Sequence, residues 1–184
     1  MRRLIEATVD ELAVSTYNDL TVRAVAARAA VSTTTAYTYF GSKDALIAEA
    51  YLDLMRHTAE FADVNDSVQC RVSMQLRELA LLIVDKAHFA DACTVALMAD
   101  GRAMDHVRMQ IAREVSRRIA AALGDDFTED VATTLHMLFS GAMLHARSED
   151  GGYGRVAGTL QASASFLLGS EKGSKPTILE DVVG

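Results

Sequence analysis

Apolar residues recur at helical spacing along most of this chain, and long alternating runs of β-branched residues are absent. In residues 22–29, for example, apolar side chains fall at i, i+3, i+4 and i+7, which marks one buried helical face. The same criterion predicts helices over residues 2–16, 22–29, 33–40, 42–62, 68–89, 90–99, 102–123, 128–147 and 153–168. The pattern therefore predicts an all-α fold with about nine helices.

The helix expected over residues 42–62 keeps its apolar period for about five turns, which is long enough to join two parts of the molecule. Short helices precede it, and longer amphipathic helices follow a polar break at residues 63–67. We therefore expect an N-terminal three-helix head over residues 1–46, a helical body over residues 47–169 and a polar tail over residues 170–184. The predicted boundary lies inside a continuous helix and not in a linker.

Composition indicates the cell compartment and the redox state in which the protein works. Half of the residues are apolar, but no run reaches the roughly 18 apolar residues of a membrane span. The first residues, Met1–Leu4, lack an apolar signal segment, so we expect a cytoplasmic protein without a membrane partner. For Cys70 and Cys93 the simpler interpretation is a pair of reduced, buried thiols, and the alternative is a disulfide or a redox switch.

The stretch from Thr21 to Lys43 reads as two short helices joined by a tight turn. Thr21, Ser32 and Ser42 stand where the N-cap residues of successive helices are expected. The second short helix is rich in hydroxyl groups, which belong to Thr33, Thr34, Thr35, Tyr37, Thr38 and Tyr39. Hydroxyl groups can hydrogen-bond to phosphates or base edges, and a threonine methyl can contact a thymine methyl. These properties suit a helix-turn-helix that reads the major groove, and the alternative is a generic threonine-rich surface helix.

This segment resembles the DNA-binding signature of the TetR family of transcriptional repressors, and the resemblance covers about residues 4–50. The matching positions are Thr21, Val25, Ala26, Ala29, Val31, Ser32, Thr35, Tyr37, Tyr39, Phe40, Ser42, Lys43 and Leu46. Two positions depart from the family pattern. The usual turn glycine is Ala30, where a left-handed conformation would carry the steric cost of a Cβ atom. The usual apolar residue before the first tyrosine is only Ala36, which thins the packing under the second helix.

The resemblance implies which residues contact DNA. Those implied to lie near the bases are Arg23, Thr33, Thr34, Thr35, Tyr37 and Thr38. Those implied to contact phosphates are Thr21, Tyr39 and Lys43, and Lys43 also stands at a helix N-terminus, whose free amide groups favour an anion. The resemblance further implies a homodimer on a palindromic operator.

The charge distribution limits how the head can bind DNA. The net charge is −7, but residues 1–50 hold five Lys/Arg and six Asp/Glu, so the head carries −1 and residues 51–184 carry −6. Phosphate neutralisation supplies most non-specific affinity, so we expect that affinity to be weak. Specific binding would then depend on a dimer and on a local cluster such as Arg23, Arg28 and Lys43.

The resemblance also implies a small-molecule site in the body. Apolar and adaptable side chains, together with one histidine, supply the candidate pocket: Phe61, Phe89, Met98, Met104, Met109, His136, Met137 and Phe139. His88 and His106 are further candidates for orienting a ligand. Each of these residues could instead belong to the ordinary core or surface. As a group they predict a small hydrophobic effector.

The last two long helices carry small residues beside large ones, which suits packing against their symmetry mates in a four-helix interface. The candidate interface residues are Leu135, Phe139, Ser140, Met143, Leu160, Ser163 and Leu167. The alternative is that these residues pack within one chain.

Motifs for catalysis are unconvincing. Residues Gly152–Ala157 fit G-x-G-x-x-A, but no strand is expected before them, so the match has no structural context. H-E-x-x-H and G-x-S-x-G are absent, and the histidines lack metal-like spacing. We therefore expect no enzyme, no metal site and no cofactor. The sequence predicts a ligand-responsive transcriptional repressor; the alternatives are an all-α carrier or enzyme without a DNA function, and a thiol-based redox regulator.

Overall fold

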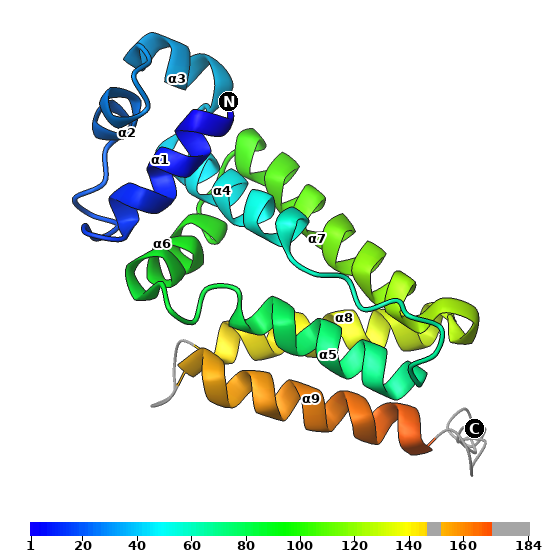
Figure 1. The fold of residues 1–184 in the computed structure, drawn as a ribbon. Coiled ribbons are helices and arrows are strands. Elements are labelled where there is room, and N and C mark those ends of the chain that lie inside the picture. The colour runs from blue at the N-terminus through cyan, green and yellow to red at the C-terminus, as the bar shows by residue number, and fades with distance from the viewer. Residues whose placement is uncertain (147–151, 171–184) are drawn as a thin grey trace, which may run out of the picture.

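The computed structural model describes residues 1–146 and 152–170, and in these ranges all the regular structure is helical (Figure 1). The helices are α1 Arg2–Leu12, α2 Val22–Arg28, α3 Thr33–Tyr39, α4 Lys43–His57, α5 Val68–Leu81, α6 Ala87–Leu97, α7 Arg102–Leu123, α8 Glu129–His145 and α9 Gly152–Ser170, with a 3₁₀ turn, η1, at Gly124–Asp126. The all-α prediction of about nine helices is confirmed over this part of the chain. Residues 171–184 of the expected tail lie outside the described residues, as does most of the turn expected at residues 148–152.

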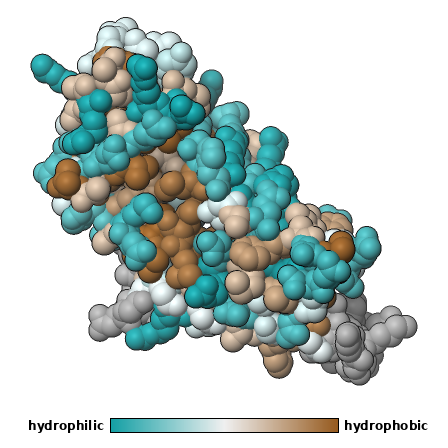
Figure 2. Space-filling model, viewed as in Figure 1, coloured by the Kyte–Doolittle hydropathy of each residue, from teal (hydrophilic) through white to brown (hydrophobic). Residues whose placement is uncertain are grey.

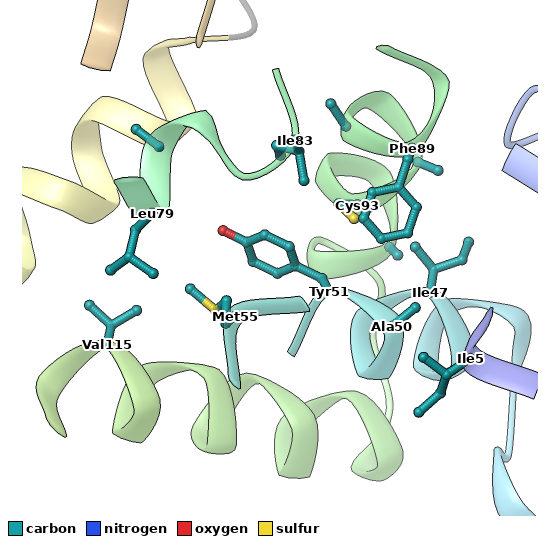
Figure 3. Packing of buried hydrophobic residues seen from close by; sticks show 14 of the residues in the cluster. Ile5, Ile47, Ala50, Tyr51, Met55, Leu79, Ile83, Phe89, Cys93 and Val115 are labelled. Carbon is teal, nitrogen blue, oxygen red and sulfur yellow. The ribbon is translucent and has the colours of Figure 1, made fainter. Parts of the chain in front are cut away.

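The head, α1 to α3, forms one end of the molecule, and α4 runs from it into the body (Figure 1). In the body, α4 packs against α6 and α7, while α5, α8 and α9 form a layer at the opposite end. One hydrophobic cluster runs through both parts, from Leu4 of α1 to Ala164 of α9. Figure 3 shows how it crosses the junction: Ile5 of the head approaches Ile47 of α4, and Phe89 of α6 lies on the same side. Head and body therefore share a core.

The fourth helix is shorter than its apolar period predicts. It ends at His57, and the predicted end at Ala62 is wrong, because Thr58 has an extended backbone with φ −79° and ψ 155°. The carbonyl groups at this end are bound by the buried guanidinium of Arg118 from α7. Arg118 donates to the carbonyl oxygens of Ala59 at 2.9 Å and Thr58 at 3.1 Å, and also to that of Met55. A side chain sixty residues away therefore ends α4.

A second buried arginine ends α7 in the same way. Arg71 of α5 donates from Nε to the carbonyl oxygen of Ala122 at 2.8 Å and from Nη2 to that of Leu123 at 3.1 Å. The last carbonyl groups of a helix have no partner within the helix, so both arginines satisfy groups that would otherwise need water. Arg71 and Arg118 are 8% and 0% exposed, so each is part of the core and not of an outer helix face.

The break between the fifth and sixth helices also differs from the prediction. The continuous helix expected over residues 68–89 ends at Leu81, and α6 begins at Ala87 instead of residue 90. In the turn between them, the amide of Val84 donates to the carbonyl of Leu81, while Ile83 is buried. Because an apolar residue of the turn faces the core, the apolar period continues across it and hides the break. Helix α1 likewise ends at Leu12, before the expected residue 16.

Across residues 1–146 and 152–170, none of the helices is both long and apolar enough to span a bilayer.

Candidate nucleic-acid interface and ligand cavity

The turn between α2 and α3 contains Ala30 in the left-handed conformation, with φ +54°. The amide of Val31 donates to the carbonyl of Ala26 at 3.0 Å, and that of Ala30 donates to the carbonyl of Ala27 at 3.1 Å. This pair of bonds is the Schellman motif that ends helices where a glycine usually stands. The expected left-handed residue at Ala30 is confirmed, and its Cβ atom makes the turn more costly than a glycine would.

Three hydroxyl side chains begin the helices of the head, as the sequence predicts. Thr21, Ser32 and Ser42 each accept a hydrogen bond from the amide three residues later, at 3.1, 3.0 and 3.0 Å. Each satisfies an amide that the first turn leaves without a partner. Together the caps fix where α2, α3 and α4 start.

Helix α3 packs against the head through Ala36, which is fully buried, and Phe40 caps its end, 2% exposed. Its other side chains face outward. Tyr37 and Tyr39 are 53% and 57% exposed, Thr34, Thr35 and Thr38 are exposed, and Thr33 is half-buried. The candidate base-contacting residues of α3 therefore lie on one accessible helix, and Arg23 of α2 is exposed as well.

The hydroxyl groups of α3 differ in how freely they can reach a partner. Thr38 donates from Oγ1 to the carbonyl of Thr34 at 2.9 Å, and the hydroxyl groups of Ser32 and Thr35 lie 2.7 Å apart. These groups keep lone pairs but have less freedom to donate. The hydroxyl groups of Tyr37 and Tyr39 make no hydrogen bond to any residue that the structure describes, so both are available to an outside partner.

Lys43 contacts Tyr17 within the head. Its ammonium group donates to the carbonyl of Tyr17 at 2.8 Å and lies 3.9 Å from the centre of the Tyr17 ring. The Tyr17 hydroxyl donates to Asp44 at 2.7 Å, and this bond raises the pKa of Tyr17 to about 12. An ammonium group has three N–H donors, so Lys43 keeps two for a phosphate. Its contact with Tyr17 was missed by the sequence analysis, since 26 residues separate the two.

Arg28, the remaining cation of the expected cluster, pairs with an acid of the head. Its Nε lies 2.6 Å from a carboxylate oxygen of Glu11. The pair partly neutralises Arg28, which leaves Arg23 and Lys43 as the cations best placed to attract a phosphate beside α3.

The body contains a mainly apolar cavity of about 300 Å³. Its wall comes from α4, the turn before α6, α6 itself, α7, α8 and α9, and includes Tyr51, Ile83, Cys93, Leu97, Ile111, Val115, Phe139, Met143 and Tyr153. On the face drawn in Figure 2, hydrophobic surface gathers in a hollow between α4, α6 and α5. The volume lies at the lower end of the range of roughly 300–1,000 Å³ found for small-molecule sites.

Three of the candidate pocket residues line this cavity: Met98, His136 and Phe139. Phe89 is buried beside α4 (Figure 3), in the core that continues into the head, and does not line the cavity. Met104 packs in a separate small cluster with Ala45 of α4 and also lies outside the cavity.

The other three candidates lie on the surface or in a loop. Met109 and Met137 are 48% and 70% exposed. Phe61 follows the early end of α4, where its amide donates to Gln75 at 3.2 Å, so the side chain does not lie on a helix directed at the cavity. Helical periodicity places a residue on a face of its own helix, but which neighbours surround that face depends on contacts far along the chain.

The candidate dimer residues divide into three groups. Leu135, Phe139 and Leu160 are 0–4% exposed within one chain, so its own core already covers them. Ser140 and Met143 line the cavity, whereas Ser163 and Leu167 lie along a shallow groove between α8 and α9. The rim of this groove carries Met137 and Phe166, which are 70% and 76% exposed, and neither was among the candidates for the interface. The accessible apolar face of α8 and α9 thus shares Ser163 and Leu167 with the predicted interface but also includes Met137 and Phe166.

The cysteines are both free thiols in different surroundings. Cys93 lines the cavity, and burial raises its pKa well above the usual range, so the thiol keeps its proton. Cys70 is exposed on α5, in contrast to the buried thiol that the sequence analysis favours.

Known proteins resemble both the sequence and the fold. The model of the tetR family of bacterial regulatory proteins matches residues 4–50. The chain is 43% identical over 169 residues to uncharacterized HTH-type transcriptional regulators of Mycobacterium tuberculosis and Mycobacterium bovis, covering 91% of this chain and 79% of each relative. The crystal structure of a TetR transcriptional regulator from a Rhodococcus species has a TM-score of 0.76 at 18% identity, covering 94% of this chain and 99% of that one.

A more distant neighbour is FadR from Bacillus subtilis, solved in complex with stearoyl-CoA, with a TM-score of 0.55 at 10% identity and coverage of 89% and 97%. At such low identities the structural neighbours show a shared fold and nothing finer. The mycobacterial relatives and the family signature in the head carry the assignment: this chain belongs to the TetR family of DNA-binding, helix-turn-helix transcriptional regulators.

Proposed function

We propose that this protein is a ligand-responsive transcriptional repressor that binds a palindromic DNA operator as a homodimer and releases it when a small hydrophobic molecule enters the body. The observation that carries the proposal is the course of α4. This helix begins at Lys43, directly after the exposed helix α3, and eight residues later it places Tyr51 in the wall of the cavity. Because such a repressor acts on chromosomal DNA, we place it in the cytoplasm.

The head supports DNA recognition by α3. Its exposed tyrosines and threonines offer hydrogen bonds to base edges, and Arg23 and Lys43 lie at either side in sequence to contact phosphates. The near-neutral head supplies little general attraction to DNA, which makes a second copy on the other half-site valuable. We assign residues 1–46 to DNA binding and residues 47–169 to effector binding and dimerisation.

The groove between α8 and α9 supports the dimer. Met137 and Phe166 are large apolar side chains exposed on adjacent helices, beside the smaller Ala162 and Ser163. An exposed apolar face of this kind suits a second copy of the same face related by a two-fold axis. Two heads held in this way would meet successive major grooves, which lie roughly 34–36 Å apart on one side of DNA.

The cavity supports the effector. Its wall is mostly apolar, and α4, α6 and α7 all contribute to it. A molecule that binds more tightly to the DNA-free conformation than to the DNA-bound one would shift the population toward the DNA-free conformation. The size of this shift is limited by the difference between its affinities for the two conformations. The FadR neighbour was solved with stearoyl-CoA, which is compatible with an apolar effector here but does not define its chemistry.

The test is selection from random duplex DNA by the purified protein at low salt. We expect an enriched site with two-fold symmetry, since two copies of α3 would read equivalent half-sites. Enrichment of an asymmetric site would contradict the homodimer, and no enrichment would contradict sequence-specific DNA binding itself.

A variant pair then tests the role of α3. Tyr37→Ala should abolish operator binding at physiological salt, a loss of about 1–3 kcal/mol at each half-site. Phe127→Ala removes an aromatic ring that is 48% exposed in the body and should leave operator affinity unchanged. Gel-shift titration of both variants, with size-exclusion chromatography to confirm an intact dimer, provides the measurement. Operator affinity retained by Tyr37→Ala would remove this residue from the reading surface.

A further inference from the structure

The wall of the cavity contains a tyrosine whose hydroxyl group has no hydrogen-bond partner among the described residues. Tyr51 of α4 is 4% exposed, yet it makes no hydrogen bond to any residue in the part of the chain that the structure describes. Figure 3 shows its ring extending from α4 with the hydroxyl oxygen on the side of Leu79 and Ile83, away from Cys93. Among the described residues, Gln75 Nε2 is the one fully buried side-chain polar atom without a partner, so the Tyr51 oxygen keeps some accessible surface in the cavity wall and can donate to an acceptor on a bound molecule.

The described residues of the wall offer no free cation to an acidic ligand. Arg108 is the charged side chain of the described lining, and its guanidinium group is already committed. Nη1 donates to the carbonyl oxygens of Leu97 at 3.0 Å and Ala99 at 2.7 Å, while Nη2 lies 2.5 Å from the Asp105 carboxylate. Arg108 therefore holds the turn between α6 and α7, and Asp105 balances its charge.

His136 is the histidine among the described lining residues, and it also has a hydrogen-bond partner. Its Nδ1 lies 2.9 Å from the hydroxyl oxygen of Ser116 on α7, so the ring links α8 to α7 at the edge of the cavity. The Tyr51 hydroxyl keeps its proton, because burial raises the pKa of this residue. The Tyr51 hydroxyl is therefore a neutral donor, and a carboxylate placed beside it would lie in mainly apolar surroundings without a free counter-ion among the described residues of the wall.

We propose that the cavity takes an uncharged, mostly apolar molecule that carries a hydrogen-bond acceptor such as a carbonyl oxygen, and that Tyr51 donates to this acceptor. The inference rests on the proposed function, since it gives the chemical class of the effector. It also makes Tyr51 the specificity-determining residue: an apolar molecule without an acceptor fills the same volume but leaves the hydroxyl unpaired. Because Tyr51 belongs to α4, the hydrogen bond acts on the helix that leads to the head.

The experiment compares three probes of similar size on the full chain by isothermal titration calorimetry. Hexanophenone carries a carbonyl group, hexylbenzene lacks an acceptor, and phenylhexanoate carries a carboxylate. We expect hexanophenone to bind most tightly and phenylhexanoate most weakly. In Tyr51→Phe, hexanophenone should bind about 3- to 10-fold more weakly, the range of one net hydrogen bond, and hexylbenzene should bind as well as before or better.

Tyr153→Phe provides the matched control, because it removes the other tyrosine hydroxyl of the lining. Loss of the ketone preference in Tyr51→Phe alone supports the assignment. An unchanged preference in Tyr51→Phe, an equal loss in both variants, tightest binding of phenylhexanoate, or no binding of any probe would each overturn it. Thermal unfolding of both variants without probe checks that the fold is retained.

The outcome is separable from that of the DNA experiment. A protein that selects an operator but shows no ketone preference loses this inference alone. A protein that shows the preference but selects no operator loses the proposed function and keeps the binding site.

Discussion

The head and the body of this protein are both helical, but they are specified over very different distances along the chain. In the head, the caps at Thr21, Ser32 and Ser42 and the turn at Ala30 involve partners within five residues. In the body, the cavity combines Tyr51 of α4 with residues as far along the chain as Tyr153 of α9. The starts of α2, α3 and α4 and the turn at Ala30 are therefore readable from a short stretch of sequence, whereas the cavity of the body is not.

The same contrast governs how each part responds to change. A local contact such as an N-cap affects one helix, and its removal changes the free energy of unfolding by about the contribution of one hydrogen bond. A long-range device such as the Arg118 cap affects α4, α7 and the loop between α4 and α5 together. Three variants test this contrast, and they are given in order of decreasing effect.

Arg118→Ala tests the long-range device. It leaves the carbonyl groups of Met55, Thr58 and Ala59 without their buried donor. It also removes one of the two arginine partners of Glu114, whose carboxylate lies 2.9 Å from Nε of Arg118. Breaking one side of a buried ion pair costs about 3–5 kcal/mol, so urea unfolding should show a loss of that size. Because one core joins head and body, we expect a single transition.

The neighbouring residue supplies the control for Arg118. Arg117 pairs with Glu60 and Glu114 but its side chain is 49% exposed, so Arg117→Ala should cost no more than about 1 kcal/mol. Equal losses for the two variants would mean that burial of Arg118 adds nothing. Two separate transitions in either variant would show that head and body unfold independently.

Ala30→Gly tests the local device in the head. Relief of the left-handed strain should stabilise the protein by up to about 1 kcal/mol, despite the greater freedom of glycine in the unfolded chain. Ala27→Gly is the matched control, three residues earlier on the exposed side of α2, and should destabilise by about 0.5–1 kcal/mol. Opposite signs in thermal unfolding are expected, and the same sign for both would refute a strained turn.

The smallest expected effect concerns the loss of stability at low pH. A hydrogen bond from Arg117 and the nearby Arg118 lower the pKa of Glu114, despite partial burial. A carboxylate whose pKa is lower in the folded state stabilises the fold above its unfolded pKa, and this stabilisation is lost as the pH falls through the folded value. Glu114→Gln should therefore reduce the loss of stability as the pH falls below the unfolded pKa of about 4.5, by less than about 1 kcal/mol.

Urea unfolding at several pH values gives the free energy of unfolding as a function of pH, and the slope of this dependence is compared between the variants. Glu6→Gln serves as the control, because Glu6 pairs with Arg2 at 3.3 Å on the open surface of α1. An unchanged slope in Glu114→Gln, or the same change in Glu6→Gln, would show that the Glu114 contacts do not govern acid sensitivity.

The sequence predicts those features that depend on neighbours along the chain. The all-α fold, the caps and the left-handed Ala30 follow from propensity, capping and turn chemistry within a few residues. The end of α4 could not be predicted, because Arg118 ends it from another helix. The candidate residues of the cavity and of the dimer face were chosen by periodicity, which gives the face of a helix but not its neighbours. Leu135 and Leu160, for example, face their own core.

The Arg118 cap has a consequence for the order in which the chain acquires its structure during synthesis. The head and α4 leave the ribosome before residue 118 exists, so at that stage nothing fixes the end of α4 and its apolar period favours extension toward Ala62. Docking of α7 would then shorten α4 as it forms. Arg118→Ala should preserve the earlier condition, visible as more helical backbone chemical shifts at residues 58–62. We therefore expect the length of α4 to be set late in folding, by a helix that is translated well after it.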